Sequence, residues 1–205
     1  MWADVRKHKN TPKKPYTISP SVSTESVLIT TAIHASGNWD VAIFDFPGAF
    51  LTLDMENEVI LVIEGDIANI MELLSPSTYR EYLSIGKSLR KILYVRLQKV
   101  IYGCICSALL FYLKLKGKLE PFGFLLNPYD ACVANKWVNV SQMAVTWHAN
   151  DLKISNKDAG EVTKIIAYLE SIYDPMVLKL GNKHTYMGME TDFTENGTVK
   201  VSMSV

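Results

Sequence analysis

The stretch that decides the fold is Met143-Ala144-Val145-Thr146-Trp147-His148-Ala149-Asn150-Asp151-Leu152-Lys153-Ile154-Ser155. Residues 143–148 and 152–155 are typical of two strands, and residues 149–151 between them predict a tight hairpin turn. Asn150 and Asp151 are favoured at such a tip because both residue types tolerate a left-handed backbone and bond their own main chain. On its own, the stretch predicts a plain hairpin that presents one carboxamide and one carboxylate.

The composition is that of a soluble globular protein with one well-buried domain. The chain has 205 residues, is 48% hydrophobic and 20% charged, and carries no net charge. Its three cysteines, Cys104, Cys106 and Cys132, are odd in number and form no C-x-x-C pair. This pattern argues against a zinc site or a disulfide framework and favours a reducing compartment, so we expect a cytoplasmic protein.

The start of the chain differs from the rest. Residues 1–20 contain five Lys or Arg and three Pro, and we interpret them as a basic arm or a truncated upstream segment before one domain over residues 21–205. Residues 1–14 are polar and basic, unlike a signal peptide. The longest uncharged apolar run, residues 100–113, is shorter than the ~20 residues that a membrane-spanning helix needs, so no membrane partner is expected.

Charge is distributed unevenly along the middle of the chain. Residues 54–81 hold seven acidic side chains and one basic one, whereas residues 82–119 hold eight basic side chains and no acidic one. A basic segment of this kind is able to follow a phosphate backbone. The alternative is a solvated face that the preceding acidic segment neutralises, and charge alone leaves both interpretations open.

Hydrophobic periodicity and turn residues predict an α+β fold, with helices packed on one face of a mainly antiparallel sheet. Residues 39–46 are apolar on both faces apart from Asp40 and Asp45, which is typical of a central strand. The predicted helices are residues 24–35, 67–74, 76–83, 104–119 and 159–173. The predicted strands are residues 39–46, 58–63, 93–98, 130–138, 143–148, 152–155, 185–193 and 198–203.

Asp45 is a carboxylate at the end of a buried strand, so it needs a cap, an arginine or a metal as a partner. The structural alternative is that it caps the turn that begins at Gly48. If the strand of Asp45 neighbours the 143–155 hairpin, Asp45 and Asp151 converge. Two or three converging carboxylates bind hard divalent cations, and two such ions activate a 3′-hydroxyl and stabilise leaving pyrophosphate.

Four motifs, in this order, resemble those of the reverse transcriptase domain of copia-type retrotransposon polyproteins. The family patterns are D-V-x-x-A-F-L, L-x-K-x-L-Y-G, Y-V-D-D-L and L-G-I or L-G-M. The matching stretches here are Asp45-Phe46-Pro47-Gly48-Ala49-Phe50-Leu51, Leu97-Gln98-Lys99-Val100-Ile101-Tyr102-Gly103, Trp147-His148-Ala149-Asn150-Asp151-Leu152 and Tyr186-Met187-Gly188-Met189. The resemblance covers roughly residue 21 to the end.

The resemblance implies a fold and an activity. The fold is the palm of a right-hand polymerase with partial fingers and no thumb, and the activity is RNA-directed DNA polymerisation with Mg²⁺, or Mn²⁺ as an alternative. The implied partners are an RNA or DNA primer–template, a deoxynucleotide and other segments of a retrotransposon polyprotein. The expected location is the cytoplasm, with a virus-like particle or the nucleus as alternatives.

The resemblance also assigns roles to single residues. Asp45 and Asp151 match metal-binding aspartates of the catalytic site. Gly48 and Ala49 match the backbone that meets the triphosphate, and Phe50 matches the aromatic residue under the incoming sugar. The residues that match the primer-holding hairpin are Tyr186, Met187 and Gly188.

Two departures from the family pattern bear on activity. Asn150 stands where the family has the first aspartate of the turn, so one charge of the metal site is replaced by a neutral carboxamide. Cys106 stands where the family has a glutamine that meets the nucleotide. We therefore expect a diverged or decayed copy with weak or no activity.

Several simpler interpretations stay open at this point. Phe50 is also suited to core packing, and for Tyr102 core packing and nucleotide contact are equally supported. His148 and Asp151 form a His-x-x-Asp spacing, but strand alternation predicts that the two side chains point in different directions. Two other functions also remain, namely a catalytically inactive nucleic-acid-binding or structural remnant and an unrelated metal-dependent hydrolase.

Overall fold

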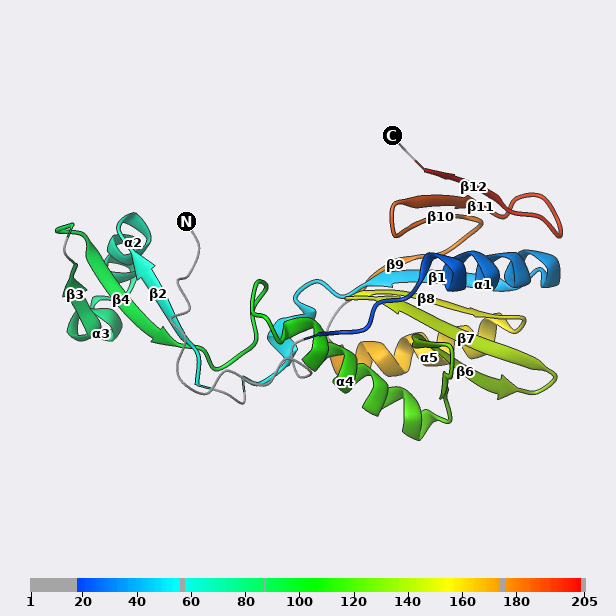
Figure 1. Ribbon diagram of the computed structural model, residues 1–205, viewed down its shortest axis with the longest axis horizontal. Coiled ribbons are helices and arrows are strands. Elements are labelled where there is room, and N and C mark those ends of the chain that lie inside the picture. The colour runs from blue at the N-terminus through cyan, green and yellow to red at the C-terminus, as the bar shows by residue number, and fades with distance from the viewer. Residues whose placement is uncertain (1–17, 56–57, 87, 174–175, 204–205) are drawn as a thin grey trace.

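The computed structural model describes residues 18–55, 58–86, 88–173 and 176–203, and its fold is mixed α/β with antiparallel sheets (Figure 1). One sheet has six strands in the order β5-β6-β7-β8-β1-β9, and two others have three strands each, in the orders β10-β11-β12 and β2-β4-β3. The predicted arm over residues 1–20 falls mostly on residues 1–17, which lie outside the described residues.

The elements follow one another along the chain as follows. The helices are α1 (Thr24–Gly37), α2 (Asp66–Leu74), α3 (Pro76–Tyr79), α4 (Ser107–Leu119) and α5 (Ala159–Tyr173). The strands are β1 (Asp40–Asp45), β2 (Ile60–Glu64), β3 (Leu83–Ile85), β4 (Lys91–Arg96), β5 (Leu125–Asn127), β6 (Asp130–Val138), β7 (Ser141–His148), β8 (Asp151–Asn156), β9 (Val177–Lys179), β10 (Lys183–Tyr186), β11 (Met189–Asp192) and β12 (Lys200–Met203). None of the helices in the described part of the chain is long and apolar enough to cross a membrane.

The prediction that β1 is a central strand is confirmed. β1 pairs with β8 along its whole length and with β9 over its last three residues. Its four middle residues, 41–44, are buried. A strand that is covered on both faces needs apolar side chains at successive positions, and Val-Ala-Ile-Phe supplies them.

Helices cover both faces of the six-stranded sheet, so the prediction that they lie on one face is wrong. Tyr112 of α4 packs on Trp147 of β7, with ring centroids 6.0 Å apart. On the opposite face, Lys153 of β8 donates a hydrogen bond to Thr31 of α1 (2.8 Å). Figure 1 shows α1 on the side of the sheet away from α4 and α5.

The packing face of α1 is more polar than its sequence pattern predicted. The sequence pattern predicts one packed face made of Val27, Leu28, Thr31, Ala32 and Ala35. Val27, Thr31 and Ala35 are buried, whereas Leu28 is 43% exposed and the buried His34 was not predicted. The Nε2 atom of His34 lies 2.7 Å from the hydroxyl of Ser155 on β8. An apolar stripe cannot reveal a packed histidine, which explains why His34 was missed. The sequence offers Ser21 and Ser23 as caps for this helix, and Ser23 is the cap, since it accepts a hydrogen bond from the Ser26 amide.

Several predicted elements are correct and others are wrong. Residues 159–173 are the helix α5 and residues 130–138 are the strand β6, both as predicted. Residues 76–83 were predicted as one helix; residues 76–82 are helical, but only α3 is α-helical, a 3₁₀ helix follows over Arg80–Tyr82, and Leu83 already belongs to β3. Residues 105 and 106 form a turn, so α4 begins only at residue 107. The three-residue strands β3, β5 and β9 were not predicted, because so few residues show no periodicity.

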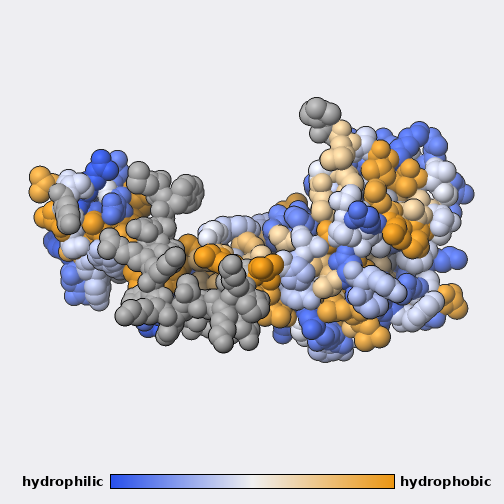
Figure 2. Space-filling model, viewed as in Figure 1, coloured by the Kyte–Doolittle hydropathy of each residue, from blue (hydrophilic) through white to orange (hydrophobic). Residues whose placement is uncertain are grey.

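A small lobe made of β2, β4, β3, α2 and α3 lies at one end of the molecule in Figure 1, away from the six-stranded sheet. Its fully buried apolar side chains among the described residues are Ala68 and Leu93. Its helix α2 exposes large apolar side chains, and Figure 2 shows hydrophobic surface on this lobe. These exposed side chains are Ile67, Ile70, Leu73 and Leu74.

The buried amine of Lys153 makes stability depend on pH. Lys153 is 3% exposed, and burial lowers its pKa from 10.5 to about 7. Below about pH 7 the folded chain holds a buried ammonium, which lowers the free energy of unfolding. This loss of stability decreases as the pH rises from about 7 toward 10.5, because the folded chain is then neutral at Lys153 while the unfolded chain is still losing its proton.

We expect Lys153→Met to remove this dependence. The unfolding free energy of the natural chain should rise relative to that of the variant by at most ~4 kcal/mol between neutral pH and about pH 10, as measured by urea denaturation. Lys157→Met, at an exposed position, is the control and should follow the natural chain. Parallel pH profiles for the natural chain and Lys153→Met would contradict the prediction.

Candidate functional site

Asp45 and Asp151 lie directly opposite each other on neighbouring strands. The antiparallel register of β1 and β8 pairs Asp45 with Asp151, so the predicted convergence of these two residues is confirmed. Directly opposite residues have Cβ atoms about 4.5–5.5 Å apart and point to the same face of the sheet. Both side chains are half-buried at the end of the central strand.

Asn150 is hydrogen-bonded to one of these carboxylates. Its side-chain amide donates to Oδ1 of Asp45, and the same nitrogen lies 3.4 Å from the carbonyl oxygen of Phe46. Asp45 therefore has a side-chain donor as its partner, rather than an amide of the turn at Gly48. A carboxamide at this position supplies a proton donor to Asp45, where an aspartate would supply a third negative charge.

His148 faces Asp151, contrary to the prediction. The turn between β7 and β8 has two residues, Ala149 and Asn150, and the register pairs His148 with Asp151 across it. Successive side chains point to opposite faces only within one strand. The two residues that flank a two-residue turn lie on different strands and are cross-strand partners, so their side chains point to the same face. The Nδ1 atom of His148 lies 2.7 Å from the hydroxyl of Ser21, so the histidine has a hydrogen-bond partner besides the facing Asp151.

The backbone of this turn also differs from the expectation. The residue with positive φ is Ala149 (φ 50°), and neither Asn150 nor Asp151 has one. A left-handed alanine is less favourable than a left-handed asparagine or glycine. The turn therefore directs Asn150 toward Asp45 with an extra backbone cost at its neighbour.

The two aspartates repel each other. Burial and, after it, the charge of Asp45 raise the pKa of Asp151, while the charges of His148 and Lys179 oppose this rise. The folded state is therefore destabilised by ionisation of Asp151. This loss of folding stability is absent well below pH 3.8, the ordinary pKa of an aspartate. It is complete once the pH has passed the raised pKa that Asp151 has in the folded chain.

Asp151→Asn should consequently stabilise the protein. We expect the free energy of unfolding near neutral pH to increase by roughly 0.2–1 kcal/mol, because like charges directly opposite each other in a sheet are destabilising by about that amount. The gain should vanish below about pH 3, where Asp151 is protonated in both states. The measurement is urea denaturation at both pH values.

Asp40→Asn is the matched control for this prediction. Asp40 lies on β1, the strand of Asp45, but its cross-strand partner on β8 is the neutral Asn156. This variant should leave stability near neutral pH almost unchanged. An Asp151→Asn variant that is less stable than the natural chain would show that repulsion is not the dominant interaction there.

The chain after Asp45 turns sharply into a short 3₁₀ helix. Gly48 has φ 74°, a left-handed value that suits glycine, and the 3₁₀ helix spans Ala49–Thr52. Ala49 is fully buried and Phe50 is 6% exposed. Of the residues that the resemblance assigns to nucleotide binding, Gly48 alone is partly accessible.

Tyr102 covers Phe50 on the side of the carboxylates. Its ring meets the ring of Phe50 edge-on with centroids 4.6 Å apart, and it is 57% exposed. Partial burial raises the pKa of Tyr102, and the charges of Asp45 and Asp151 add to the rise. The aromatic surface beside the two carboxylates thus belongs to Tyr102, while Phe50 packs in the core against Phe111 (6.1 Å).

Alanine substitutions should separate these two aromatic residues. Phe50→Ala is expected to cost about 3–5 kcal/mol of stability, because it opens a cavity in the core. Tyr102→Ala should cost roughly 1 kcal/mol or less, since most of that side chain is in solvent. Thermal and urea unfolding of both variants measure this difference, and equal losses would contradict the assignment of Phe50 to the core.

The segment that resembles a primer-holding hairpin is a two-residue hairpin between β10 and β11. Tyr186 pairs with Met189, and the turn residues Met187 (φ 51°) and Gly188 (φ 75°) both have positive φ, as hairpins of this length require. The predicted single strand over residues 185–193 is therefore wrong. Tyr186 is buried, Met187 is half-buried and Gly188 is exposed, so the turn is the accessible part.

The donors at the site suit one hard cation better than two. Two opposed carboxylate groups are suitable oxygen ligands for such an ion. Within the described ranges, however, no group of three or more His, Cys, Asp or Glu side chains is placed to hold a metal ion. The amide nitrogen of Asn150 already occupies an oxygen of Asp45.

The basic segment after residue 82 is partly neutralised. Lys91 pairs with Glu72, and Lys99 pairs with Asp54 at 2.7 Å; both carboxylates belong to the acidic segment. This agrees with the alternative that a solvated acidic face offsets the basic residues. Lys114 instead donates hydrogen bonds to the carbonyl oxygen (2.9 Å) and hydroxyl (3.1 Å) of Thr52 beside the 3₁₀ helix.

No protein-family model matches this chain, and no curated protein does either. Solved structures with a partly similar backbone are telomerases. Apo telomerase from Candida tropicalis truncated from its C-terminal domain is 14% identical, with a TM-score of 0.46, over 90% of this chain and 41% of that one. The other apo telomerase structure from this organism is 13% identical, with a TM-score of 0.46, over 91% and 37%.

Telomerase from Candida albicans, solved in complex with a fragment of telomeric RNA, is 11% identical, with a TM-score of 0.47, over 92% of this chain and 36% of that one. The chain thus spans less than half the length of each of these telomerases. At such low identities and TM-scores, the likeness assigns neither a family nor an activity.

Proposed function

We propose that the chain is a diverged reverse-transcriptase-like polymerase domain, built as a palm with partial fingers, and impaired in catalysis by Asn150. The observation that carries this proposal is the pairing of Asp45 with Asp151 at one end of the central strands. Paired carboxylates at that position are what nucleotidyl transfer to a primer 3′-end requires. The four motifs of the sequence supply the resemblance to copia-type elements.

Asp45 and Asp151 would hold a hard divalent cation, Mg²⁺ or Mn²⁺, through their carboxylate oxygens. Such an ion supplies Lewis-acid polarisation of phosphoryl oxygens and lowers the pKa of a bound hydroxyl. The protein's own part is to hold both carboxylates on one face of the sheet. The exposed ring of Tyr102 and the partly accessible Gly48 lie on the segments that adjoin these carboxylates.

Asn150 accounts for the expected impairment. It removes one negative charge from the site, and its amide nitrogen donates to Asp45 where a metal ion would need a free oxygen. Two cations close together repel strongly, so a site with two carboxylates should hold a pair of them much more weakly than a site with three. The natural chain is therefore proposed to bind one divalent ion weakly and to extend primers poorly.

Primer extension by the natural chain and by Asn150→Asp tests this function. We expect little or no extension by the natural chain and an increase of at least ~100-fold in the variant with Mg²⁺, because a missing charged ligand weakens metal affinity by about that factor or more. The same change should raise the Mg²⁺-induced shift in melting temperature. Primer extension and thermal unfolding, each measured across Mg²⁺ and Mn²⁺ concentrations, give these two readouts.

Two further variants act as controls. Asn150→Ala removes the hydrogen bond to Asp45 without adding charge and should stay inactive. Asp45→Asn in the Asn150→Asp background should abolish any extension that was gained. Robust extension by the unmodified chain would contradict the impairment, and neither extension nor a Mg²⁺ shift in Asn150→Asp would contradict the polymerase-like function itself.

The remaining expectations belong to this proposal. Primer–template and deoxynucleotide would be the partners at the carboxylates, alongside other segments of a retrotransposon polyprotein. The location would be the cytoplasm, a virus-like particle or the nucleus.

A further inference from the structure

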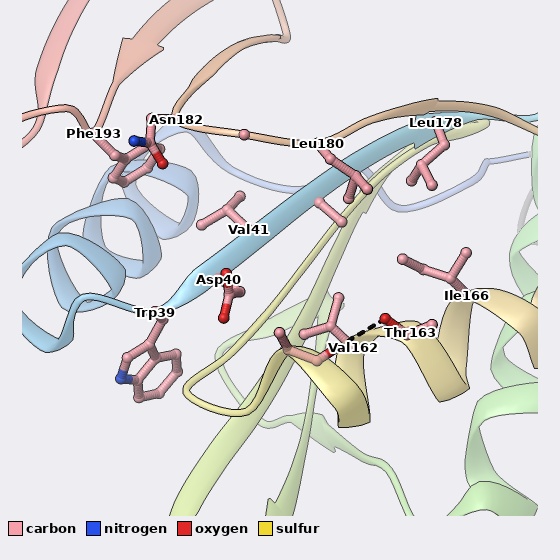
Figure 3. A pocket seen from close by; sticks show the side chains of 13 residues that line it. Trp39, Asp40, Val41, Val162, Thr163, Ile166, Leu178, Leu180, Asn182 and Phe193 are labelled. Carbon is pink, nitrogen blue, oxygen red and sulfur yellow. Dashed lines mark hydrogen bonds between the residues drawn. The ribbon is translucent and has the colours of Figure 1, made fainter.

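Two hollows in the described part of the molecule differ in the chemistry of their walls. Figure 3 shows one of about 270 Å³ between β1 and α5, where Val41, Val162 and Ile166 belong to a mainly apolar lining that includes no lysine or arginine. The other has a volume of about 440 Å³ and is lined in part by Lys99 and Lys114. We call this second one the lysine hollow.

The lysine hollow is open to solvent. Besides Lys99, its lining comes from residues 47–52, from α4 and from the end of α5. Leu51 is 53% exposed, and the side chain of Lys99 is 48% exposed. Tyr173, which is 1% exposed, supplies a buried wall. A small ion therefore has access to the ammonium groups from solvent.

This hollow is on the opposite face of the six-stranded sheet from the two carboxylates. Leu152 pairs with both Phe44 and Trp147, so these three side chains share one face of the sheet, and α4 packs on that face. Successive side chains of a strand point to opposite faces, so Asp45 points away from Phe44 and from α4. Lys114 belongs to α4. The lysine hollow is thus separate from the site of the two aspartates.

The ammonium group of Lys114 has neutral hydrogen-bond partners. It donates to the carbonyl oxygen of Thr52 at 2.9 Å and to the hydroxyl of the same residue at 3.1 Å. An ammonium group has three N–H donors, so one remains for a ligand. Burial, and after it the positive charges of Lys118 and Lys99, lower the pKa of this lysine. The charge of Asp54 opposes them and is the weakest of these influences.

Lys99 brings a second ammonium group to the hollow. It donates to Oδ1 of Asp54 at 2.7 Å, which leaves two of its three N–H donors outside that pair. Among the described lining residues, the acidic side chain is Glu170, and it is exposed. Two neighbouring ammonium groups repel each other, and an anion bound beside both would relieve this repulsion.

We propose that the lysine hollow binds a phosphate group, carried either by a nucleotide or by the backbone of a nucleic acid. A phosphate brings at least one negative charge and several strong acceptor oxygens, which suit the remaining N–H donors of Lys99 and Lys114. The proposal does not rest on the function proposed for Asp45 and Asp151, because the hollow lies on the other face of the sheet.

The test is an NMR titration of the isotopically labelled chain with sodium phosphate at constant ionic strength, with sodium chloride as the reference anion. We expect a dissociation constant on the order of 1 mM. The amide shifts should appear at Gly48, Thr52 and Ser171, which line the lysine hollow, and not at Val162 in the apolar one.

Charge variants of the chain test the two lysines. Lys114→Gln and Lys99→Gln should each weaken phosphate binding roughly 5-fold, as expected for one partly exposed ion pair. Glu170→Gln should strengthen binding roughly 2-fold, because it removes a negative charge from the lining. Lys157→Gln, at an exposed position outside the hollow, is the matched control and should bind as the natural chain does.

Two larger ligands distinguish the sources of the phosphate group. One is a deoxynucleoside triphosphate without divalent ions, and the other is a single-stranded oligodeoxynucleotide of about eight nucleotides. The source is the ligand whose affinity falls in Lys114→Gln. For the oligonucleotide, the slope of log affinity against log salt concentration should also decrease by about one in that variant. No fall for either ligand would overturn the proposal.

Other results would overturn it as well. One is that phosphate at about 20 mM shifts residues 48, 52 and 171 no more than chloride does. Another is that Lys114→Gln and Lys99→Gln both bind phosphate as tightly as the natural chain. Asp45→Asn should leave phosphate binding unchanged, and a loss of binding in that variant would place the phosphate at the carboxylates instead. None of these readouts depends on polymerase activity or on Asn150.

Discussion

The antiparallel pairing of β1 with β8 determines the position of every residue in the candidate site. Six consecutive pairs, from Asp40 opposite Asn156 to Asp45 opposite Asp151, fix the register. The side-chain period of a strand is two, so a slip by one residue would move both the aspartates and the buried apolar residues to the wrong faces. The burial of Phe44 and Leu152, each 1% exposed or less, therefore holds the two carboxylates opposite each other.

This pairing places a destabilising charge pair beside the buried core of the six-stranded sheet. Asp45 and Asp151 repel each other, and the structure offsets the repulsion with the amide of Asn150 and the charges of His148 and Lys179. Functional sites commonly combine such local cost with a rigid surrounding core. In this chain Asn150 makes the site easier to fold and, on the proposed function, poorer at holding cations.

The sequence was sufficient to predict the features that depend on periodicity and on strong turn residues. α5, the β6–β7 hairpin and the central position of β1 follow from apolar patterns long enough to distinguish helix from strand. The convergence of Asp45 with Asp151 was predicted only on the condition that their strands are neighbours, and the pairing of β1 with β8 meets that condition. The roles of these residues in catalysis remain predictions.

Other features could not be predicted, for physical reasons that differ from case to case. The short strands β3, β5 and β9 exist through tertiary pairing, which three residues cannot encode. The Met187–Gly188 turn lacks the usual asparagine, and its positive φ at methionine is set by the pairing of β10 with β11. That His148 faces Asp151 was also missed from the sequence. The alternation of side chains within one strand was applied to two residues that lie on different strands, on either side of a two-residue turn.

The contact between α1 and the six-stranded sheet is polar, and this has a consequence for the order in which the molecule unfolds. The helix is attached by hydrogen bonds from Lys153 to two threonines and between His34 and Ser155, with few large apolar side chains buried between them. Detachment of such a helix exposes little apolar area, so its opening is weakly sensitive to denaturant and carries a small heat-capacity change. In native-state hydrogen exchange, α1 would thus behave as a separate cooperative unit that opens before the β7–β8–β1 core.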